Sequence, residues 1–460
     1  MAILRAYAFP HPPLAIPAVG KGEEGKIQAT LSAFDEAAAE IAALAPETLV
    51  FITPHSVLYR DYFHISPGGG ALGSFARFGI PEARFVEYDA ALAEEIARLA
   101  ENAGLAAGPF GERDEKLDLG VMVPLWFLGR RFQNHRIVRI SQSGMDAAAH
   151  YRLGQCIAQA ADKTDRRAVL IASGDLSHKL QDGSPYGFAS EGPAFDNAVT
   201  AALGAADFLS LFAIPERVRE RAAECGYNSL MVLAGCLDCR EVDARLFSYE
   251  GPFGVGYAVA GFAPGEADES RNFLEQYENI RLAQVRERQR SEDCYRSLAR
   301  QSLEFRVQNG RTLPLPDGLP SELLQNRAGV FVSLHKNGRL RGCVGTVTPE
   351  QENIALEIIQ CAVLAGLSDR RFEPVTADEL PHLVYKVDVL SAPEPISGSE
   401  ALDIRRYGVI VSAGDRRGLL LPNLEGIDTV AKQITIARKK AGIAAGANVR
   451  LERFEVVRHE

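Results

Sequence analysis

Three histidines each follow a stretch of sequence that is typical of a β-strand. His11 stands in FPHPP after the apolar residues 3–9, His55 follows TLVFIT, and His178 lies in SGDLSH after AVLIA. Proline lacks an amide donor and fixes its own φ, so it ends a strand and stiffens the loop that holds His11. In open α/β sheets, the loops at the carboxyl ends of the strands meet at a ligand-binding crevice. We therefore expect these three loops to form one shared site.

Several imidazoles together with a carboxylate are typical ligands of a first-row transition metal. Asp175 shares the loop of His178, and Glu224 stands beside Cys225 in a stretch expected to be helical. Two histidines and one carboxylate leave open positions on the metal, as in non-haem Fe(II) oxygenases. Zinc with three protein ligands and a water is the alternative. A third histidine would then be free to transfer protons.

The elements that must position these residues alternate between strands and helices, which predicts an α/β sheet flanked by helices over residues 1–264. The expected strands are 3–9, 48–53, 136–141, 168–173 and 255–262. The expected helices are 26–44, 90–103, 146–161, 195–202 and 215–237. Residues 265–290 are charged and poor in apolar side chains, which predicts a linker that becomes a solvated helix. A second domain is expected over 291–460, with strands at 329–334, 383–390 and 408–412.

Length and composition limit the possible functions. The 460 residues exceed the usual size of a single domain, so two domains are expected. The formal net charge of −10 argues against nucleic acid or an anionic membrane as the main partner. No apolar run approaches the roughly 20 residues that span a bilayer, and the N-terminus lacks the basic start of a secretory signal. Seven scattered cysteines fit a reducing compartment, so we expect a cytoplasmic protein.

At these residues the first domain, 1–264, resembles the class III extradiol dioxygenases of the LigB type and the related Memo family. HPPL, TPHS and SGDLSH occur in the order that those families use. The resemblance implies that His11, His55 and Glu224 bind Fe(II) and that His178 is the catalytic acid or base. Asp175, three residues before His178, is expected to orient its imidazole or tune its pKa.

Two features depart from the dioxygenase pattern. LDLGVMVPL places Leu119, after Asp118, where those enzymes carry a histidine that supports the site, and a leucine can neither donate nor accept a proton. The pair Cys225-Gly226 resembles the Memo branch, in which a Cys-Gly pair contributes the cysteine to the metal site. The sequence favours Glu224 as the third ligand, with Cys225 as the alternative.

Residues 291–460 resemble the AMMECR family, which implies an α+β domain. RLRGCVGT (339–346) is the family's signature, and SDRRFEPVTADEL, VDVLSAPEPI and RGLLLPNL follow in its order. We expect the signature to be a turn that presents backbone amides, a guanidinium and a thiol to an anion or a partner; its residues are Arg341, Gly342, Cys343, Gly345 and Thr346. The alternative is a glycine turn with a buried cysteine. AMMECR and Memo-type domains are associated with a radical-SAM protein, in the grouping called AmmeMemoRadiSam, so the resemblance also implies a radical-SAM partner.

Three functions follow from these observations. The first is a non-haem Fe(II) oxygenase that acts with O2 on a small aromatic substrate, with an AMMECR accessory domain. The second is a hydrolase on the same fold that uses Zn(II) or another metal to activate water. The third is a non-catalytic Memo-like component that works with the radical-SAM partner. The presence of His11, His55, His178 and Glu224 together favours the first, whereas Leu119 favours the other two. A homo-oligomer is compatible with all three.

Overall fold

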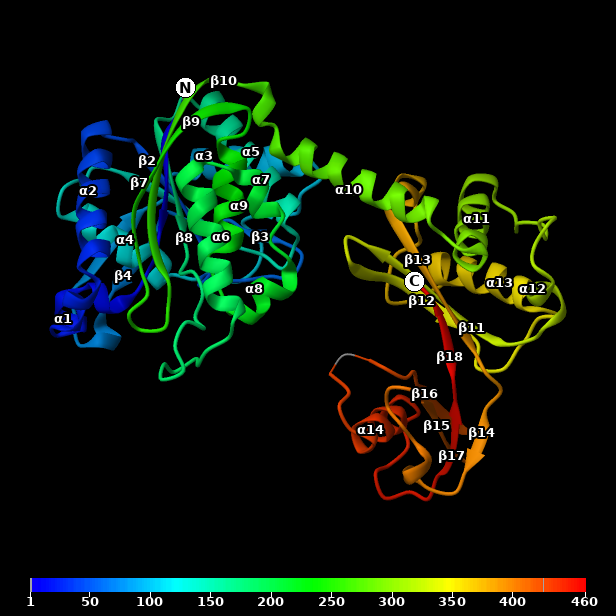
Figure 1. The fold of residues 1–460 in the computed structure, drawn as a ribbon. Coiled ribbons are helices and arrows are strands. Elements are labelled where there is room, and N and C mark those ends of the chain that lie inside the picture. Colours follow the sequence, from blue (N-terminus) through cyan, green and yellow to red (C-terminus); the bar gives the residue numbers. More distant parts are fainter. Residues whose placement is uncertain (1, 425) are drawn as a thin grey trace. The chain divides into compact units, whose positions relative to one another are not determined.

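The structure is a computed structural model that describes residues 2–424 and 426–460 (Figure 1). The chain divides into two compact units, Met1–Glu278 and Asn279–Glu460, and helix α10 (Phe273–Arg290) contributes residues to both. The predicted linker over 265–290 is therefore mostly this helix. Within the described residues, no helix has the length and apolar character needed to cross a bilayer.

A six-stranded sheet forms the centre of the first unit, in the order β7-β2-β8-β1-β10-β9. Four strands run parallel, namely β1 (Ile3–Phe9), β2 (Thr48–Thr53), β7 (Arg136–Ser141) and β8 (Ala168–Ser173). Antiparallel to β1 is β10 (Tyr257–Ala267), which pairs in turn with β9 (Arg240–Glu250). The four parallel strands lie at their predicted bounds, because strands buried on both faces read as continuous apolar runs.

Helices cover both faces of this sheet, as expected for an α/β domain (Figure 1). Phe9 and Phe51 pack with α2 (Gln28–Leu44) and α4 (Leu119–Gly129) on one face. On the other face Ala8 and Ile52 pack with α3 (Ala90–Asn102), α5 (Ala147–Lys163), α6 (Glu191–Ala205) and α9 (Tyr227–Cys236). Smaller elements complete the unit: α1 (Pro17–Gly20), α7 (Phe208–Phe212), α8 (Glu216–Ala222), β3 (Phe63–His64), β4 (Gly70–Ser74), β5 (Ala83–Glu87) and β6 (Ala107–Gly108).

The prediction of one helix over 215–237 is wrong. Helix α8 ends at Ala222, the next residue, Ala223, has a left-handed φ of 53°, and α9 begins only at Tyr227. Residues 223–226 therefore form a loop, so Glu224 and Cys225 are not helical. Apolar residues at helical spacing continue on both sides of the break, and Gly226, directly before α9, is the one sequence signal that marks it.

The second unit has the expected α+β architecture. Helices α11 (Cys294–Asn309), α12 (Ser321–Gln325) and α13 (Ile354–Leu367) accompany a four-stranded sheet. Its strands, in order, are β12 (Arg339–Gly345), β11 (Gly329–Lys336), β13 (Leu383–Leu390) and β18 (Val456–His459). A second sheet, packed with α14 (Val430–Lys440), contains β14 (Glu394–Ile396), β17 (Arg450–Phe454), β15 (Gly408–Ala413) and β16 (Arg416–Leu420).

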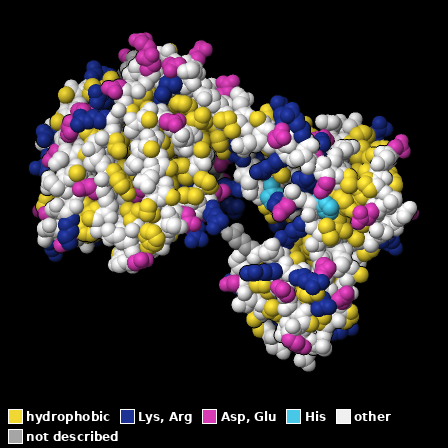
Figure 2. Space-filling model, in the orientation of Figure 1, with side chains coloured by type: hydrophobic (Ala, Val, Ile, Leu, Met, Phe, Trp, Pro, Cys, Tyr) yellow, Lys and Arg dark blue, Asp and Glu magenta, His cyan; other side chains and the backbone are white. Residues whose placement is uncertain are grey.

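On the face drawn in Figure 2, basic and acidic side chains are interspersed on the surface of each unit. Mixed charge of this kind is common on the surfaces of globular proteins.

His150 has a structural role in the first unit. Its side chain is fully buried on α5, where Nδ1 lies 2.9 Å from the carbonyl oxygen of Asp146. The amide of Ser143 donates to Nε2 over 3.3 Å, so the neutral ring connects the loop after β7 to the first turn of α5. Burial lowers the pKa of His150 to about 4.

This lowered pKa predicts a specific loss of stability in acid. The unfolded chain binds a proton at His150 near pH 6.5 and the folded chain does so only near pH 4, so stability falls as the pH drops through this window. Between pH 7 and 4.5, the wild-type free energy of unfolding should fall by about 2 kcal/mol more than that of His150→Gln. Urea titrations of both proteins at several pH values measure the difference. Parallel pH profiles would contradict the assignment.

Candidate metal centre

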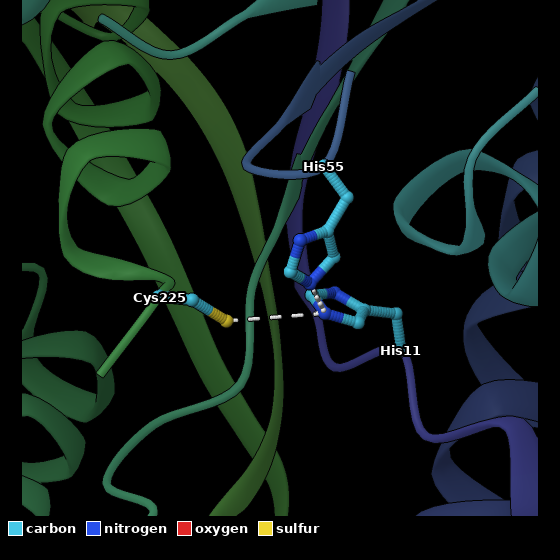
Figure 3. A group of neighbouring side chains, drawn as sticks. All are labelled: His11, His55 and Cys225. Carbon is cyan, nitrogen blue, oxygen red and sulfur yellow. Dashed lines mark hydrogen bonds between the residues drawn. The ribbon is translucent and has the colours of Figure 1, made fainter. Parts of the chain in front are cut away.

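The site lies where β1 and β2 end, on either side of β8 in the sheet. His11 and His55 follow the carboxyl ends of β1 and β2, and Cys225 belongs to the loop before α9. The ligand atoms of these three side chains lie within 4.8 Å of one another. The two Nε2 atoms are 2.9 Å apart, and the Cys225 Sγ is 3.8 Å from the His11 Nε2 (Figure 3). Residues far apart in the sequence thus direct three potential metal ligands at one point.

The protonation of the two histidines suits a metal ion. His11 is buried, and its Nδ1 lies 3.1 Å from the Ser173 hydroxyl, so a proton on Nδ1 leaves the Nε2 lone pair directed toward His55. Burial lowers the pKa of His11 to about 4. Burial also lowers the pKa of His55, and repulsion from a positive charge on His11 lowers it further. Metals bind neutral imidazole, and both rings are held in that form.

The thiol of Cys225 completes the donor set. Burial raises its pKa well above the usual value, and the charge of Asp175 adds to this effect. A bound cation reverses this preference, since a coordinating thiol is deprotonated. Two neutral imidazoles and a thiol held within 4.8 Å therefore fit a first-row transition metal.

The structure brings Cys225, and not Glu224, to the histidine pair. One carboxylate oxygen of Glu224 accepts a hydrogen bond of 2.7 Å from the backbone amide of Tyr227, at the start of α9. Burial raises the pKa of Glu224 to about 7. The geometry therefore makes Cys225 the candidate third ligand in place of Glu224, because Glu224 accepts a hydrogen bond from the backbone of the helix that follows.

Asp175 lies between the histidine pair and His178. Its Oδ1 accepts a 2.8 Å hydrogen bond from the His11 amide, and its Oδ2 is 4.0 Å from both the His11 Nε2 and the His178 Nε2. Burial raises the pKa of Asp175 to about 6. His178 is fixed through its own amide, which donates to the Ala222 carbonyl over 2.9 Å. The imidazole of His178 therefore stands beside the three-residue cluster without belonging to it.

Close contact between two glycines sets the position of Cys225. A Cβ on Gly174 would lie 2.1 Å from the Cα of Gly226, a distance that no side chain tolerates. The loop after β8 and the loop before α9 therefore touch backbone to backbone. Across this contact the Asp175 amide donates to the Cys225 Sγ over 3.3 Å.

Asp118 and Leu119 lie at the start of α4. Asp118 caps the helix by accepting from the Gly120 amide over 2.8 Å, and its Oδ1 also accepts from the Thr53 hydroxyl over 2.6 Å. Leu119 lines a pocket of about 670 Å³ together with His55 and Asp118. The residue that replaces the expected histidine therefore supplies an apolar wall beside the candidate metal centre.

Three supporting residues were missed in the sequence. Ser173 contacts His11, and the fully buried Asp196 accepts from the Ser177 amide and the Tyr249 hydroxyl, which holds the loop of His178. The buried guanidinium of Arg139 donates to the carbonyls of residues 114 and 116, over 2.6 and 2.7 Å, and so holds the segment that leads to Asp118. Two of them could have been noticed in the sequence: Asp196 directly follows Phe195, and Arg139 lies within an apolar strand. A charged residue in such a place is expected to be buried with a polar partner.

The AMMECR signature is a strand and not the expected turn. Its residues form β12, and a Cβ on Gly342 would lie 2.1 Å from the Ala365 carbonyl oxygen, so this glycine permits close packing on α13. A Cβ on Gly345 would similarly meet the Val330 carbonyl oxygen at 2.4 Å. Both glycines are needed because a neighbouring backbone packs against them, and neither forms a turn.

The side chains of the signature are already paired within the second unit. Arg341 forms an ion pair of 2.7 Å with Glu379, and Thr346 donates to Glu357 over 2.7 Å. Cys343 is half-buried and accepts from the Ser333 hydroxyl. The Arg341 guanidinium and the Cys343 thiol therefore contact other residues of the unit and are not arranged around the anion site expected from the sequence.

Comparison with known proteins agrees with this fold. Residues 5–260 match the family described as the catalytic LigB subunit of aromatic ring-opening dioxygenase, and residues 296–459 match AMMECR1. The chain thus belongs to the LigB family and carries a C-terminal AMMECR1 domain.

The chain is similar to proteins that match all of it and to proteins that match one part of it. Protein CA_C1420 of Clostridium acetobutylicum is 37% identical over the full length of both chains. A Thermotoga maritima protein is 48% identical over 34% of this chain and 92% of its own. An uncharacterized Escherichia coli K12 protein has a solved structure that covers 56% of this chain and 99% of its own, at 15% identity and a TM-score of 0.41. An uncharacterized Pyrococcus horikoshii protein covers 36% and 88%, at 29% identity and a TM-score of 0.34.

The geometry predicts which substitutions remove the metal. His11→Ala, His55→Ala and Cys225→Ser should each weaken binding more than about 100-fold, since even residues that only support ligands contribute 10–100-fold. Glu224→Gln should keep the metal, because the amide oxygen still accepts from the Tyr227 amide. Elemental analysis after anaerobic reconstitution measures occupancy. Loss of metal in Glu224→Gln with retention in Cys225→Ser would make the carboxylate the ligand.

Proposed function

We propose that the first unit is a metal-dependent oxygenase of the extradiol type, which uses Fe(II) and O2 to oxidise a small phenolic compound. The observation that carries the proposal is the convergence of His11, His55 and Cys225 within 4.8 Å, beside a pocket large enough for one aromatic ring. Membership of the LigB family supports the same reaction class.

His11, His55 and Cys225 would hold the ion. When bound, Fe(II) supplies open positions at which a substrate oxygen and O2 can be brought together. The protein keeps these positions next to the 670 Å³ pocket, because His55 lines it. Ser173, through its contact with His11, fixes the orientation of one ligand.

The pocket supplies the remaining functions. Leu117, Leu119 and Met122 give it apolar walls, which suit an aromatic ring and exclude water. Asp118 and His55 place polar atoms at the same wall, where a phenolic hydroxyl can be oriented. The pocket therefore favours a flat, mostly apolar substrate with at least one hydroxyl group.

His178 is the residue that moves the substrate proton. Its Nε2 is 4.0 Å from the Asp175 carboxylate, which is within the range of an electrostatic interaction. Its Nδ1 is buried and has no hydrogen-bond partner among the described residues. Leu119 cannot carry a proton, so we assign this task to His178, which lies on the other side of Asp175 from His11 and outside the set of residues that line the 670 Å³ pocket.

Anaerobic purification tests the proposal directly. The protein is loaded with Fe(II), mixed with a panel of catechols and exposed to O2, while an oxygen electrode and mass spectrometry follow the reaction. We expect one O2 consumed per catechol and a ring-opened product that contains both oxygen atoms. Tight Fe(II) binding with no O2 uptake on any catechol would contradict the oxygenase function.

A zinc-dependent hydrolase is the second candidate, and Cys225 is the observation that favours it. Zinc is commonly bound by mixed cysteine and histidine ligands, with a water at the open position of catalytic sites. His178 would then accept a proton from the attacking water. Zinc in the anaerobically purified protein, together with hydrolysis of model esters, would replace the oxygenase by this function.

The role of His178 predicts a separation of binding from turnover. His178→Ala should retain metal and substrate binding while kcat falls by about 10²–10⁴-fold, the usual contribution of general acid–base catalysis. Asp182→Asn, an exposed change in the same loop, is the matched control and should leave kcat unchanged. Steady-state kinetics and metal analysis provide the two measurements. Metal loss in His178→Ala would make it a ligand, and unchanged turnover would exclude it from the mechanism.

A further inference from the structure

A second pocket, of about 310 Å³, lies in the first unit between α4 and the β4–β5 hairpin. Its walls are largely apolar and include Phe75, Val86, Leu117, Met122 and Leu125. None of the three candidate metal ligands lines it. It shares Ala83, Leu117 and Met122 with the pocket beside His55, so it is a neighbouring but separate space.

Two buried nitrogen atoms at this pocket have no hydrogen-bond partner among the described residues. They are the Trp126 Nε1 and the His135 Nδ1. An indole nitrogen can only donate, and a buried donor without an acceptor is unfavourable. Burial lowers the pKa of His135 to about 4, and the charge of Arg84 adds to this, so its ring is neutral. A ligand that brings an acceptor would satisfy the indole donor.

Two guanidinium groups stand at the same pocket. Arg84 and Arg130 line the pocket, and within the described part of the chain neither forms an ion pair. One carboxylate, that of Glu82, also lines the pocket. The Arg84 Nη1 lies over Gly129, in the last turn of α4: a Cβ built on this glycine would be 3.2 Å from that nitrogen. The pocket thus combines apolar walls with an excess of positive charge.

We propose that this pocket binds a small apolar molecule with one carboxylate, such as a medium-chain or arylalkyl acid. The hydrocarbon part fills the apolar walls, and the carboxylate pairs with Arg84 and Arg130 and accepts from the Trp126 indole. Guanidinium and carboxylate form charge-assisted, often bidentate hydrogen bonds, which makes arginine the usual partner of such a group. This site goes beyond the proposed oxygenase function and does not require the metal.

Trp126 is the single tryptophan of the chain, so its fluorescence reports directly on the pocket. The full-length protein is titrated with octanoate, with and without a chelator, and with 1-octanol as the neutral counterpart. Octanoate should produce a saturable change in Trp126 emission and a matching calorimetric heat, whether or not metal is present. Octanol should bind at least about tenfold more weakly, since it lacks the charge.

Substitutions locate the binding site. Arg84→Gln and Arg130→Gln should each raise the Kd for octanoate about tenfold, whereas Arg113→Gln, an exposed arginine outside the pocket, should not change it. Trp126→Phe, followed by calorimetry, should weaken binding because the indole donor is lost. Circular dichroism verifies that each variant is folded. The absence of both heat and fluorescence change, equal affinity for octanol, or an unchanged Kd in both arginine variants would overturn the proposal.

Discussion

The backbone contact between Gly174 and Gly226 is the constraint on which the candidate site depends. It brings the loop after β8 against the loop before α9, and a single methyl group at Gly174 would push them apart. Because of this contact, Cys225 reaches His11 and Asp175, although it follows β8 by some fifty residues. The parallel sheet alone brings His11, His55 and the His178 loop to one edge; the glycine contact adds the thiol.

Several ionisable side chains are gathered and buried at this edge of the sheet. Burial favours the neutral forms of His11, Asp175 and Cys225, and the Nε2 atoms of the two imidazoles lie at hydrogen-bond distance, 2.9 Å apart. Such clustering of ionisable groups with shifted pKa values costs folding stability and is characteristic of functional sites. The surrounding structure, through Ser173, Asp196 and Arg139, holds the cluster in place.

The sequence predicted the parallel strands and both histidines at their ends, because strands buried on two faces are continuous apolar runs with clear boundaries. It failed where packing decides the backbone. The break at 223–226 is marked only by Gly226, between two stretches of helical pattern. The glycines of β12 are typical of a turn, but here they permit close contact with α13 and β11. The choice between Glu224 and Cys225 depends on the direction of adjacent side chains, which composition and spacing do not determine.

Spectroscopy of the Co(II)-substituted protein tests the central claim most directly, namely that His11, His55 and Cys225 bind one ion together. Cobalt is added anaerobically to the metal-free protein, and the near-ultraviolet and visible spectra are recorded. We predict a thiolate-to-cobalt charge-transfer band that saturates at one equivalent, disappears in Cys225→Ser and persists in Glu224→Gln. A spectrum that lacks this band at full occupancy, or one that is unchanged in Cys225→Ser, would contradict the account.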